Sequence, residues 1–199
     1  MRVIAGKYRS RLLKSLKDPA LRPTSDQLRE TLFNVLGPSV ADSRFLDVFA
    51  GTGAVGIEAL SRGAFEVIFI ENHRPAAALI RRNLEALGIS DEATVLAVEA
   101  LRGLELLSSR YKVSDPPIDF VFLDPPYAAA EDYTRVLNFL AHANFLASAA
   151  TIIVEHHKNF SLPEQFGSLR VFRVLKQGDA SLSFFRYTRT SGHPSQPLN

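Results

Sequence analysis

From residue 45 onward, short apolar runs alternate with segments whose apolar residues recur at helical spacing, and this alternation most constrains the fold. The apolar runs predict five strands, and the segments that follow the first four predict helices. Strands that are separated by helices favour a doubly wound parallel sheet with right-handed crossovers. The predicted strands are residues 45–49, 66–70, 94–98, 118–123 and 151–154.

The C-terminal part has a different pattern. Two β-like runs, 169–175 and 181–187, flank Gly178-Asp179, which predicts an antiparallel hairpin at one edge of the sheet. The expected fold class is therefore α/β, with a doubly wound, mostly parallel, seven-stranded, Rossmann-like sheet. The expected divisions of the chain are a basic arm (1–23), one domain (24–189) and a disordered polar tail (190–199).

The residue types that are missing exclude several kinds of chemistry. The 199-residue chain has no cysteine, which excludes disulfides, thiolate zinc sites and a cysteine nucleophile. No run approaches the ~20 apolar residues of a membrane-spanning helix, and the first residues lack the apolar region of a secretory signal. We therefore expect a cytoplasmic protein without a membrane partner.

The apolar run 118–123 ends in Asp124-Pro125-Pro126-Tyr127. The run predicts a buried strand, and the two prolines end its pairing because neither has an N–H to donate. Open α/β sheets bind ligands at the carboxyl ends of their strands. A carboxylate, a backbone carbonyl and an aromatic ring at such a turn can hold a flat amine by two hydrogen bonds and stacking. These four residues are the predicted catalytic residues.

A glycine-rich loop follows the first predicted strand. Gly51, Gly53 and Gly56 match the pattern G-x-G-x-x-G, and Glu71 lies twenty residues after Gly51, at the end of the next strand. This is formally the fingerprint of dinucleotide-binding folds, in which the acid binds ribose hydroxyls. An NAD-dependent oxidoreductase is therefore one interpretation of the loop.

Three features favour another cofactor. Asp47 places a carboxylate where it can bind a ligand's ammonium group, and this charge is unfavourable near a pyrophosphate. The strand–helix alternation begins only after a basic arm and a helix, and hydride transfer does not need the amine-holding turn. A cofactor with an amino-acid end, a ribose and an adenine fits better, which indicates S-adenosylmethionine.

Each part of this cofactor has a candidate partner. Asp47 and the glycine loop are expected to bind the methionine end, Glu71 the ribose hydroxyls, and Glu99, at the end of the third strand, the adenine amine. The predicted cofactor-binding residues are Asp47, Phe49, Ala50, Gly51, Thr52, Gly53, Gly56, Glu71, Asn72, Glu99 and Ala100.

The arm concentrates positive charge. Residues 1–23 contain seven cations against Asp18 alone and carry about +6, so the remainder carries about −4 within the formal net charge of +2. A basic segment on a slightly acidic body indicates contact with a polyanion, although such runs are also common on solvated surfaces. The predicted RNA-binding residues are Arg2, Lys7, Arg9, Arg11, Lys14 and Arg22.

The motifs resemble those of the adenosylmethionine-dependent amino-methyltransferases, which carry Asp/Asn-Pro-Pro-Tyr/Phe after the fourth strand. More narrowly, nearly the whole chain is similar to the bacterial small-subunit (16S) rRNA guanine-N2 methyltransferases. Its most specific segments are Leu21-Arg22-Pro23-Thr24-Ser25-Asp26 and Glu58-Ala59-Leu60-Ser61-Arg62-Gly63. The resemblance implies methyl transfer from S-adenosylmethionine to the N2 amine of a guanine in 16S rRNA, within an assembled or partly assembled small ribosomal subunit.

The chain departs from the pattern of this family at three positions. Ser10 stands where a second glycine is usual in the arm, and Glu99 where Asp or Asn is commoner. Gln177 stands where a tyrosine often precedes the Gly-Asp of the final hairpin. The first departure affects the path of the arm and the second the adenine contact, but none affects the predicted catalytic turn.

In the expected mechanism, the Asp124 carboxylate and the Pro125 carbonyl accept the two N–H groups of a flipped guanine, and Tyr127 stacks on its ring. No metal is expected, since His156-His157 beside Glu155 has no helical ligand spacing. The alternatives are an adenine-N6 DNA methyltransferase, a glutamine-N5 protein methyltransferase, and a non-catalytic RNA-binding assembly factor. The first usually needs extra length for target recognition, and the second usually has Asn in place of Asp124.

Overall fold

The computed structural model describes residues 1–15, 24–126 and 130–188. In these ranges the chain forms one eight-stranded sheet with the order β3-β2-β1-β4-β5-β8-β7-β6. The strands are β1 (Arg44–Val48), β2 (Glu66–Ile70), β3 (Ala93–Leu96), β4 (Ile118–Leu123), β5 (Leu146–His157), β6 (Gln165–Phe166), β7 (Leu169–Gln177) and β8 (Ala180–Tyr187). The helices are α1 (Asp26–Leu36), α2 (Ala54–Ser61), α3 (Arg74–Leu87), α4 (Ala100–Arg110) and α5 (Ala130–Leu140), with a 3-10 turn, η1 (Gly37–Val40), after α1. None of these helices is long and apolar enough to cross a membrane.

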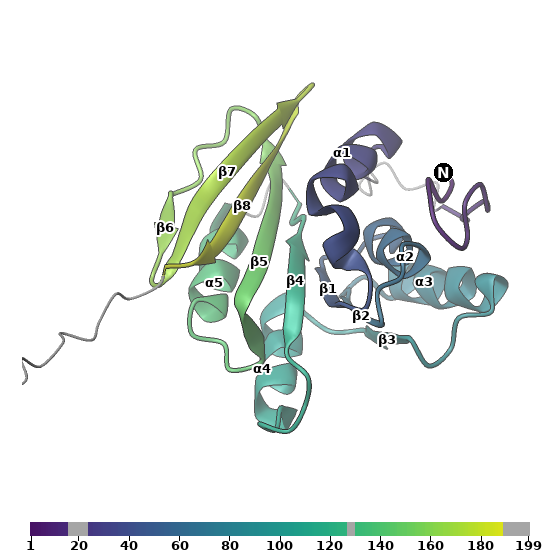
Figure 1. Ribbon diagram of the computed structural model, residues 1–199, viewed down its shortest axis with the longest axis horizontal. Helices are drawn as coiled ribbons and strands as arrows, with labels where there is room; N and C mark the ends of the chain where they lie inside the picture. Colours follow the sequence, from purple (N-terminus) through teal and green to yellow (C-terminus); the bar gives the residue numbers. More distant parts are fainter. Residues whose placement is uncertain (16–23, 127–129, 189–199) are drawn as a thin grey trace, which may run out of the picture.

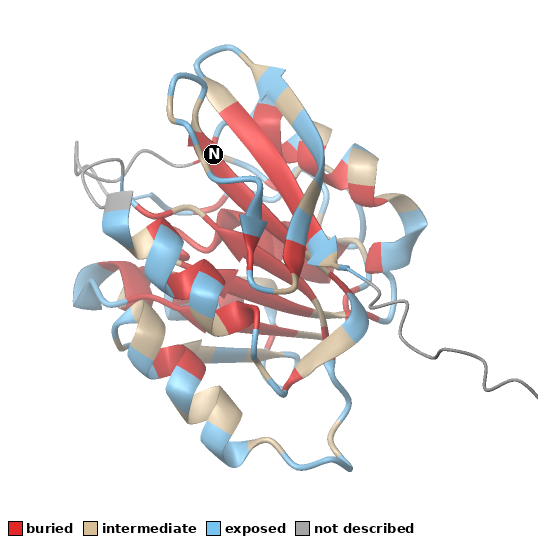
Figure 2. Ribbon diagram, turned by 90° about the vertical axis from the view of Figure 1, so that its left-hand side faces the viewer, coloured by how far each residue is buried: buried red, intermediate tan, exposed pale blue. Residues whose placement is uncertain are grey.

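Helices cover both faces of the parallel part of the sheet (Figure 1). On one face, Phe33 of α1, Ile57 of α2 and Ile80 of α3 share a core cluster with side chains of β1, β4, β5 and β8. On the other face, Leu104 of α4 and Leu137 of α5 belong to a second cluster. Buried strands therefore form the centre of the molecule, and the outer sides of the helices are exposed (Figure 2).

The strand order places a ligand-binding edge between β1 and β4. Strand β1 pairs in parallel with both neighbours, through Val48 with Ile70 of β2 and with Leu123 of β4. The order of connection reverses at this point, because β2 and β3 lie on one side of β1, and β4 and β5 on the other. Such topological switch points are where open α/β sheets bind ligands, beyond the carboxyl ends of the strands. The residues that follow β1, β2 and β4 meet at this edge.

The doubly wound, mostly parallel sheet and the C-terminal antiparallel hairpin predicted from the sequence are confirmed. The sheet has one strand more than predicted, because β6 is only two residues long and such a short segment has no hydrophobic period. Strand β5 is also longer than predicted, since its C-terminal half pairs with β8 from Ile152 to His157. Three predictions lie outside the described residues, namely Arg22, Tyr127 and the tail 190–199.

Helix α1 begins at a side-chain N-cap. The Ser25 hydroxyl accepts the N–H of Leu28 at 3.1 Å, as an N-cap does. The preceding residue, Thr24, is buried, and its hydroxyl donates to the Glu155 carboxylate of β5 at 3.0 Å. The start of α1 is thereby tied to the carboxyl end of β5.

Residues 1–15 pack against α2 and α3. The buried Glu58 carboxylate of α2 accepts the N–H groups of Ile4 and Ala5 at 2.8 and 3.0 Å. The Asn83 side chain of α3 binds both the N–H and the carbonyl of Lys14. These contacts to buried polar side chains fix the backbone of the arm, so the described part of the arm is an integral part of the domain.

We expect Gly6→Ala to lower the free energy of unfolding by about 2–4 kcal/mol, measured in urea. A Cβ at this position would lie 1.7 Å from the backbone oxygen of Ser61, and the Gly6 φ of +82° already disfavours alanine. Gly88→Ala is the matched control, because its φ is +70° but no heavy atom lies within 4 Å of the added Cβ. The control should lose only about 1 kcal/mol. Equal losses in the two variants would contradict close packing of the arm on α2.

Candidate active site at the carboxyl ends of the strands

The glycine loop turns sharply between β1 and α2. Phe49, Gly51 and Gly53 have φ values of +62°, +54° and +75°, and the Gly53 N–H donates to the Ala50 carbonyl at 2.7 Å. Gly56 is required for a different reason, since a Cβ there would lie 2.3 Å from the Phe69 ring of β2. The glycine spacing predicted as a ligand loop thus gives both a tight turn and close packing of α2 on the sheet.

Two buried carboxylates hold this loop. One Asp47 oxygen accepts the Gly56 N–H at 2.9 Å, and Asp47 is 2% exposed. Glu71 accepts the N–H of Gly51 with one oxygen and that of His73 with the other, both at 2.7 Å. Burial raises the pKa of Asp47 to about 8, with a further contribution from the negative charge of Glu71, whereas the Gly56 hydrogen bond opposes the rise.

These carboxylates suit the polar groups of S-adenosylmethionine. A carboxylate offers about four lone-pair positions, and the backbone donors use one of Asp47 and two of Glu71. Acceptor positions therefore remain for hydroxyl and ammonium donors beside the glycine turn. A cationic ammonium group near Asp47 would also lower the pKa of its carboxyl by favouring the charged form. The free acceptor positions of Asp47 and Glu71 fit the cofactor that the sequence indicates.

We expect Asp47→Asn to flatten the pH dependence of stability. The Asp47 pKa is about 8 in the folded protein against an ordinary value of 3.8. The folded state therefore binds the extra proton, and the contribution of Asp47 to stability is lost as pH rises from about 4 through about 8. Urea unfolding of the wild type should lose roughly 2–3 kcal/mol more than the variant between about pH 5.5 and 8.5. The same loss in both proteins would contradict the raised pKa.

The third predicted acid lies on the loop that follows β3. Strand β3 ends at Leu96, and Glu99 occupies the N-cap position of α4 as an exposed residue. Ala100 begins that helix, and Asn72 is exposed directly after Glu71. The structure therefore gathers Asp47, Glu71 and the glycine loop closely, whereas Glu99 lies on the loop between β3 and α4.

The predicted catalytic turn continues β4 at the same edge. Asp124 is half-buried, and its N–H donates to the Val48 carbonyl of β1 at 3.5 Å. Pro125 is buried and Pro126 is exposed. The turn thus starts beside the strand that leads into the glycine loop, which is the juxtaposition expected of an amine site next to a methyl donor.

A second carboxylate adjoins Asp124. Leu123 pairs with Val154, so Asp124 and Glu155 follow at neighbouring strand ends. Burial, the negative charge of Glu155 and that of Asp47 raise the pKa of Asp124 well above its ordinary value, and a hydrogen bond from Thr24 opposes this rise. Burial also raises the pKa of Glu155 to about 7, again opposed by Thr24. The Thr24 hydroxyl has one proton to donate to the two neighbouring carboxyl groups, Asp124 and Glu155. These two groups therefore tend to keep one proton between them.

Thr24 and Glu155 were not predicted as site residues. Both are buried, at 7% and 6% exposed, and they lie 131 positions apart in the chain. The sequence offers only a weak signal, namely one acid directly after the apolar part of β5. Residues along a strand alternate between its faces, so His156 points away from this site, and its Nε2 lies 2.8 Å from the Ser183 hydroxyl. Within the described ranges, no group of three or more His, Cys, Asp or Glu residues has a geometry that could hold a metal ion.

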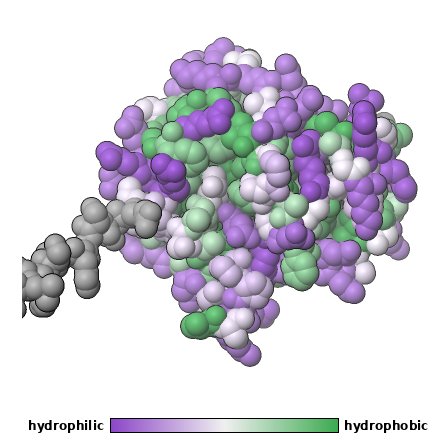
Figure 3. Space-filling model, viewed as in Figure 1, coloured by the Kyte–Doolittle hydropathy of each residue, from purple (hydrophilic) through white to green (hydrophobic). Residues whose placement is uncertain are grey.

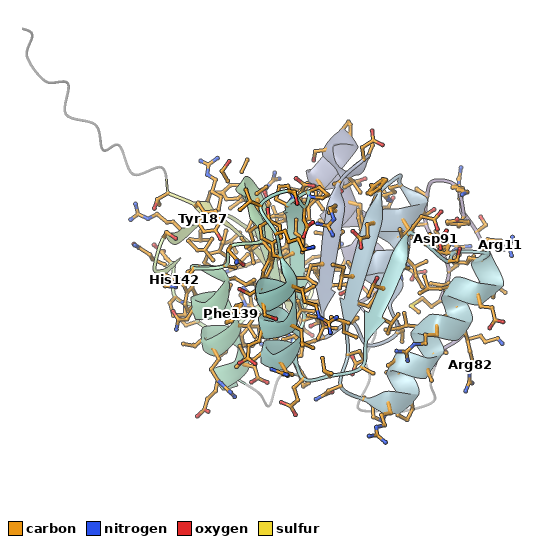
Figure 4. All side chains as sticks on the ribbon, turned by 90° about the horizontal axis from the view of Figure 1, so that it is seen from below. Arg11, Arg82, Asp91, Phe139, His142 and Tyr187 are labelled. Carbon is orange, nitrogen blue, oxygen red and sulfur yellow. The ribbon has the colours of Figure 1, made fainter. Side chains whose placement is uncertain are left out.

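The first residue of the arm lies beside the glycine loop, and the rest of its described part contacts α2 and α3. The Thr52 hydroxyl is 3.8 Å from the Met1 sulfur. Arg11, labelled in Figure 4, reaches the end of α3, where it donates to the Ala86 carbonyl at 3.1 Å. The described members of the predicted RNA-binding set are all exposed: Arg2, Lys7, Arg9, Arg11 and Lys14. The contacts of Lys7 with Ser61, of Arg11 with Ala86 and of Lys14 with Asn83 place these three cations near the C-terminal ends of α2 and α3.

Comparisons with known proteins identify the family of the chain. Residues 1–186 match the model of the family described as Conserved hypothetical protein 95. "Ribosomal RNA small subunit methyltransferase D" of Haemophilus influenzae is 38% identical over 174 residues, which cover 85% of this chain and 86% of that protein. The protein of the same name from Escherichia coli K12 is 36% identical over 82% of this chain and 78% of its own length. The solved structure of "Putative methyltransferase yhhF from Escherichia coli" superposes with a TM-score of 0.80 at 32% identity, over 94% of this chain and 97% of that one.

Proposed function

The chain belongs to the family described as Conserved hypothetical protein 95, and on that premise we propose that it methylates the exocyclic N2 amine of a guanine in small-subunit rRNA. The names of its relatives, which are small-subunit rRNA methyltransferases, support the reaction and the substrate class. The observation that carries the proposal is the position of Asp124-Pro125 beside the glycine loop, with a buried carboxylate on each neighbouring strand.

The methyl donor is S-adenosylmethionine, which supplies an electrophilic methyl group on a sulfonium. Asp47 and the loop backbone from Phe49 to Gly53 bind the methionine end, and Gly56 sets the helix that supports them. Glu71 and Asn72 bind the ribose, and Glu99 with Ala100 contacts the adenine from the start of α4. The three carboxylates, Asp47, Glu71 and Glu99, are acceptors for the N–H and O–H donor groups of the cofactor.

The amine of guanine is a weak nucleophile because its lone pair is delocalised into the ring. The Asp124 carboxylate and the Pro125 carbonyl accept its two N–H groups and thereby orient the lone pair, while Tyr127 stacks on the base. Positive charge that grows on the nitrogen is stabilised by the Asp124 carboxylate. The raised pKa of Asp124 makes it a better proton acceptor near neutral pH, so it takes the proton that the methylated amine releases.

The target guanine reaches the turn at the strand ends as a flipped or unpaired nucleotide, because its amine is not accessible to the methyl group while the base is stacked and paired. Cations of the arm bind phosphates, which gives affinity with little sequence information. Selectivity then comes from the shape of a folded RNA, and the substrate is an assembled or partly assembled small ribosomal subunit.

Transfer of labelled methyl from S-adenosylmethionine to four acceptors in parallel tests the proposal. The acceptors are unmethylated small ribosomal subunits, protein-free 16S rRNA, duplex DNA and a release-factor-like protein, followed by nuclease digestion of the nucleic acids. We expect N2-methylguanine in the subunits or the rRNA. Label in DNA as N6-methyladenine, or in the protein, would replace the proposed substrate. Binding of S-adenosylmethionine without any transfer would favour a non-catalytic assembly factor.

A further inference from the structure

The strands of the β7–β8 hairpin carry positive charge, and Asp179 in the turn between them is paired with Lys158. The two strands contain four cations, Arg170, Arg173, Lys176 and Arg186, and neither contains Asp or Glu. In Figure 1 this hairpin extends beyond α1, and its face on the α1 side has no helix over it. Figure 3 shows the same face, where apolar (green) and hydrophilic (purple) residues lie next to one another in the upper left part.

The three arginines of these strands and one aromatic ring lie on that face. Side chains alternate along a strand, and the shift in register between Val171 and Arg173 places two consecutive residues on one side. Leu169 and Val171 pack into the cluster on the α4–α5 side. The opposite side of the hairpin therefore carries what we call the hairpin patch: Arg170, Phe172, Arg173 and Arg186.

Contacts within the hairpin patch confirm this arrangement. The Phe172 ring lies 6.2 Å from the ring of Phe184, which belongs to the cluster on the α1 side. The Arg186 guanidinium lies 4.8 Å from the centroid of the Phe172 ring. Arg186 is also paired in register with Arg170. The aromatic ring thus contacts one guanidinium group and shares its surface with two further arginines.

The hairpin patch is open to solvent. All four of its residues are exposed, and Phe172 has an exposed fraction of 45%. Among the residues that the structure describes, its three arginines form no ion pair with an acidic side chain. Exposed guanidinium groups without counter-charges, interleaved with an aromatic ring, are the combination that binds phosphates and stacks on unpaired bases.

The hairpin patch lies within reach of RNA that occupies the catalytic turn. Arg173 is in register with Phe184, which pairs with Ile153, which pairs with Phe122. Three strand spacings and two residues separate Arg173 from Asp124, so the backbones are about 14 Å apart across the sheet and about 7 Å apart along it. The hairpin patch and the arm lie on the same face of the sheet, with α1 between them (Figure 1).

We propose that the hairpin patch is a second RNA-binding surface, on which the three arginines bind backbone phosphates and Phe172 stacks on an unpaired base of the substrate. The proposal rests on the proposed function, since it requires an RNA substrate. RNA bound at the catalytic turn then contacts the protein on both sides of α1. The charge complementarity favours RNA over a protein partner, because a protein interface is poor in uncompensated like charges.

The test compares the double variant Arg170→Gln/Arg173→Gln with the wild type in binding to protein-free small-subunit rRNA over a range of salt concentrations. We expect about tenfold weaker binding at 0.1 M salt and a salt slope smaller by about 1.4, because two phosphate contacts are lost. Arg102→Gln/Arg110→Gln is the matched control, since both residues are exposed on α4, on the opposite face of the sheet. The control should change neither quantity.

Phe172→Leu separates stacking from charge. Leucine still covers Phe184 but cannot stack on a base, so binding should weaken severalfold with an unchanged salt slope. The affinity for S-adenosylmethionine should stay the same in every variant. If the wild type methylates rRNA but the double variant binds RNA with the wild-type affinity and slope, the hairpin patch proposal is wrong. If the wild type methylates no RNA at all, the proposed function itself fails.

Discussion

Asp124→Asn should lower the rate of methyl transfer by about 10²–10⁴-fold, while the affinity for S-adenosylmethionine changes by less than about threefold. Asparagine has nearly the same shape, but it is neutral and replaces one acceptor oxygen with an N–H₂ donor. The variant therefore loses the charge that stabilises the developing cation and offers a donor where the amine needs an acceptor. The cofactor contacts of Asp47 and Glu71 lie on other strands and remain.

Single-turnover transfer to small-subunit rRNA and titration of S-adenosylmethionine measure the two quantities separately. Asp132→Asn provides the matched control, because this half-exposed carboxylate on α5 pairs only at 3.8 Å with Arg135. The control should transfer methyl groups at the wild-type rate. A variant Asp124→Asn that keeps more than a third of the wild-type rate would show that Asp124 does not hold the amine.

The parts of the site that local sequence specifies were predictable. The glycine loop needs small residues at fixed spacing, since Gly53 has a φ of +75° and a Cβ on Gly56 would overlap Phe69. The proline pair ends β4 wherever the strand is placed, so Asp124 was predicted at a strand end. Both motifs act within a few residues, and their physical requirements are visible in the sequence.

The parts that depend on pairing between distant segments were not predictable. Thr24 and Glu155 meet only because β4 pairs with β5 in one register and α1 packs across these strands. The arm gives another example, since the buried Glu58 that holds it reads as one more polar residue of a surface helix. In both cases a charged residue that the sequence alone would place on the surface is buried and binds a distant segment. Burial is a property of the tertiary fold, so the sequence does not reveal it.

The contact between Glu155 and Asp124 has a consequence for the pH dependence of the reaction. Asp124 must be ionised to accept the amine, so the rate of transfer should rise with pH through the raised pKa of Asp124. Glu155→Gln removes a neighbouring negative charge and keeps an acceptor for the Thr24 hydroxyl. The pKa of Asp124 then falls, because its charged form is no longer opposed by Glu155. The acidic limb of the rate profile should therefore move to lower pH.

At pH values below the raised pKa of Asp124, the Glu155→Gln variant should therefore transfer methyl groups faster than the wild type, whereas the two rates should converge at higher pH, where Asp124 is ionised in both proteins. Stability provides an independent readout, because the Glu155 pKa of about 7 exceeds its ordinary value of 4.5 and so the wild type loses stability as pH rises between these values. The variant should lose less over the same interval in urea unfolding. Glu164→Gln, an exposed change outside the site, should leave the rate profile and the stability profile unaltered. If the Glu155→Gln variant is slower and the acidic limb of its rate profile coincides with that of the wild type, Glu155 only supports the local packing. Removal of a negative charge that raises the pKa of Asp124 would have to displace this limb.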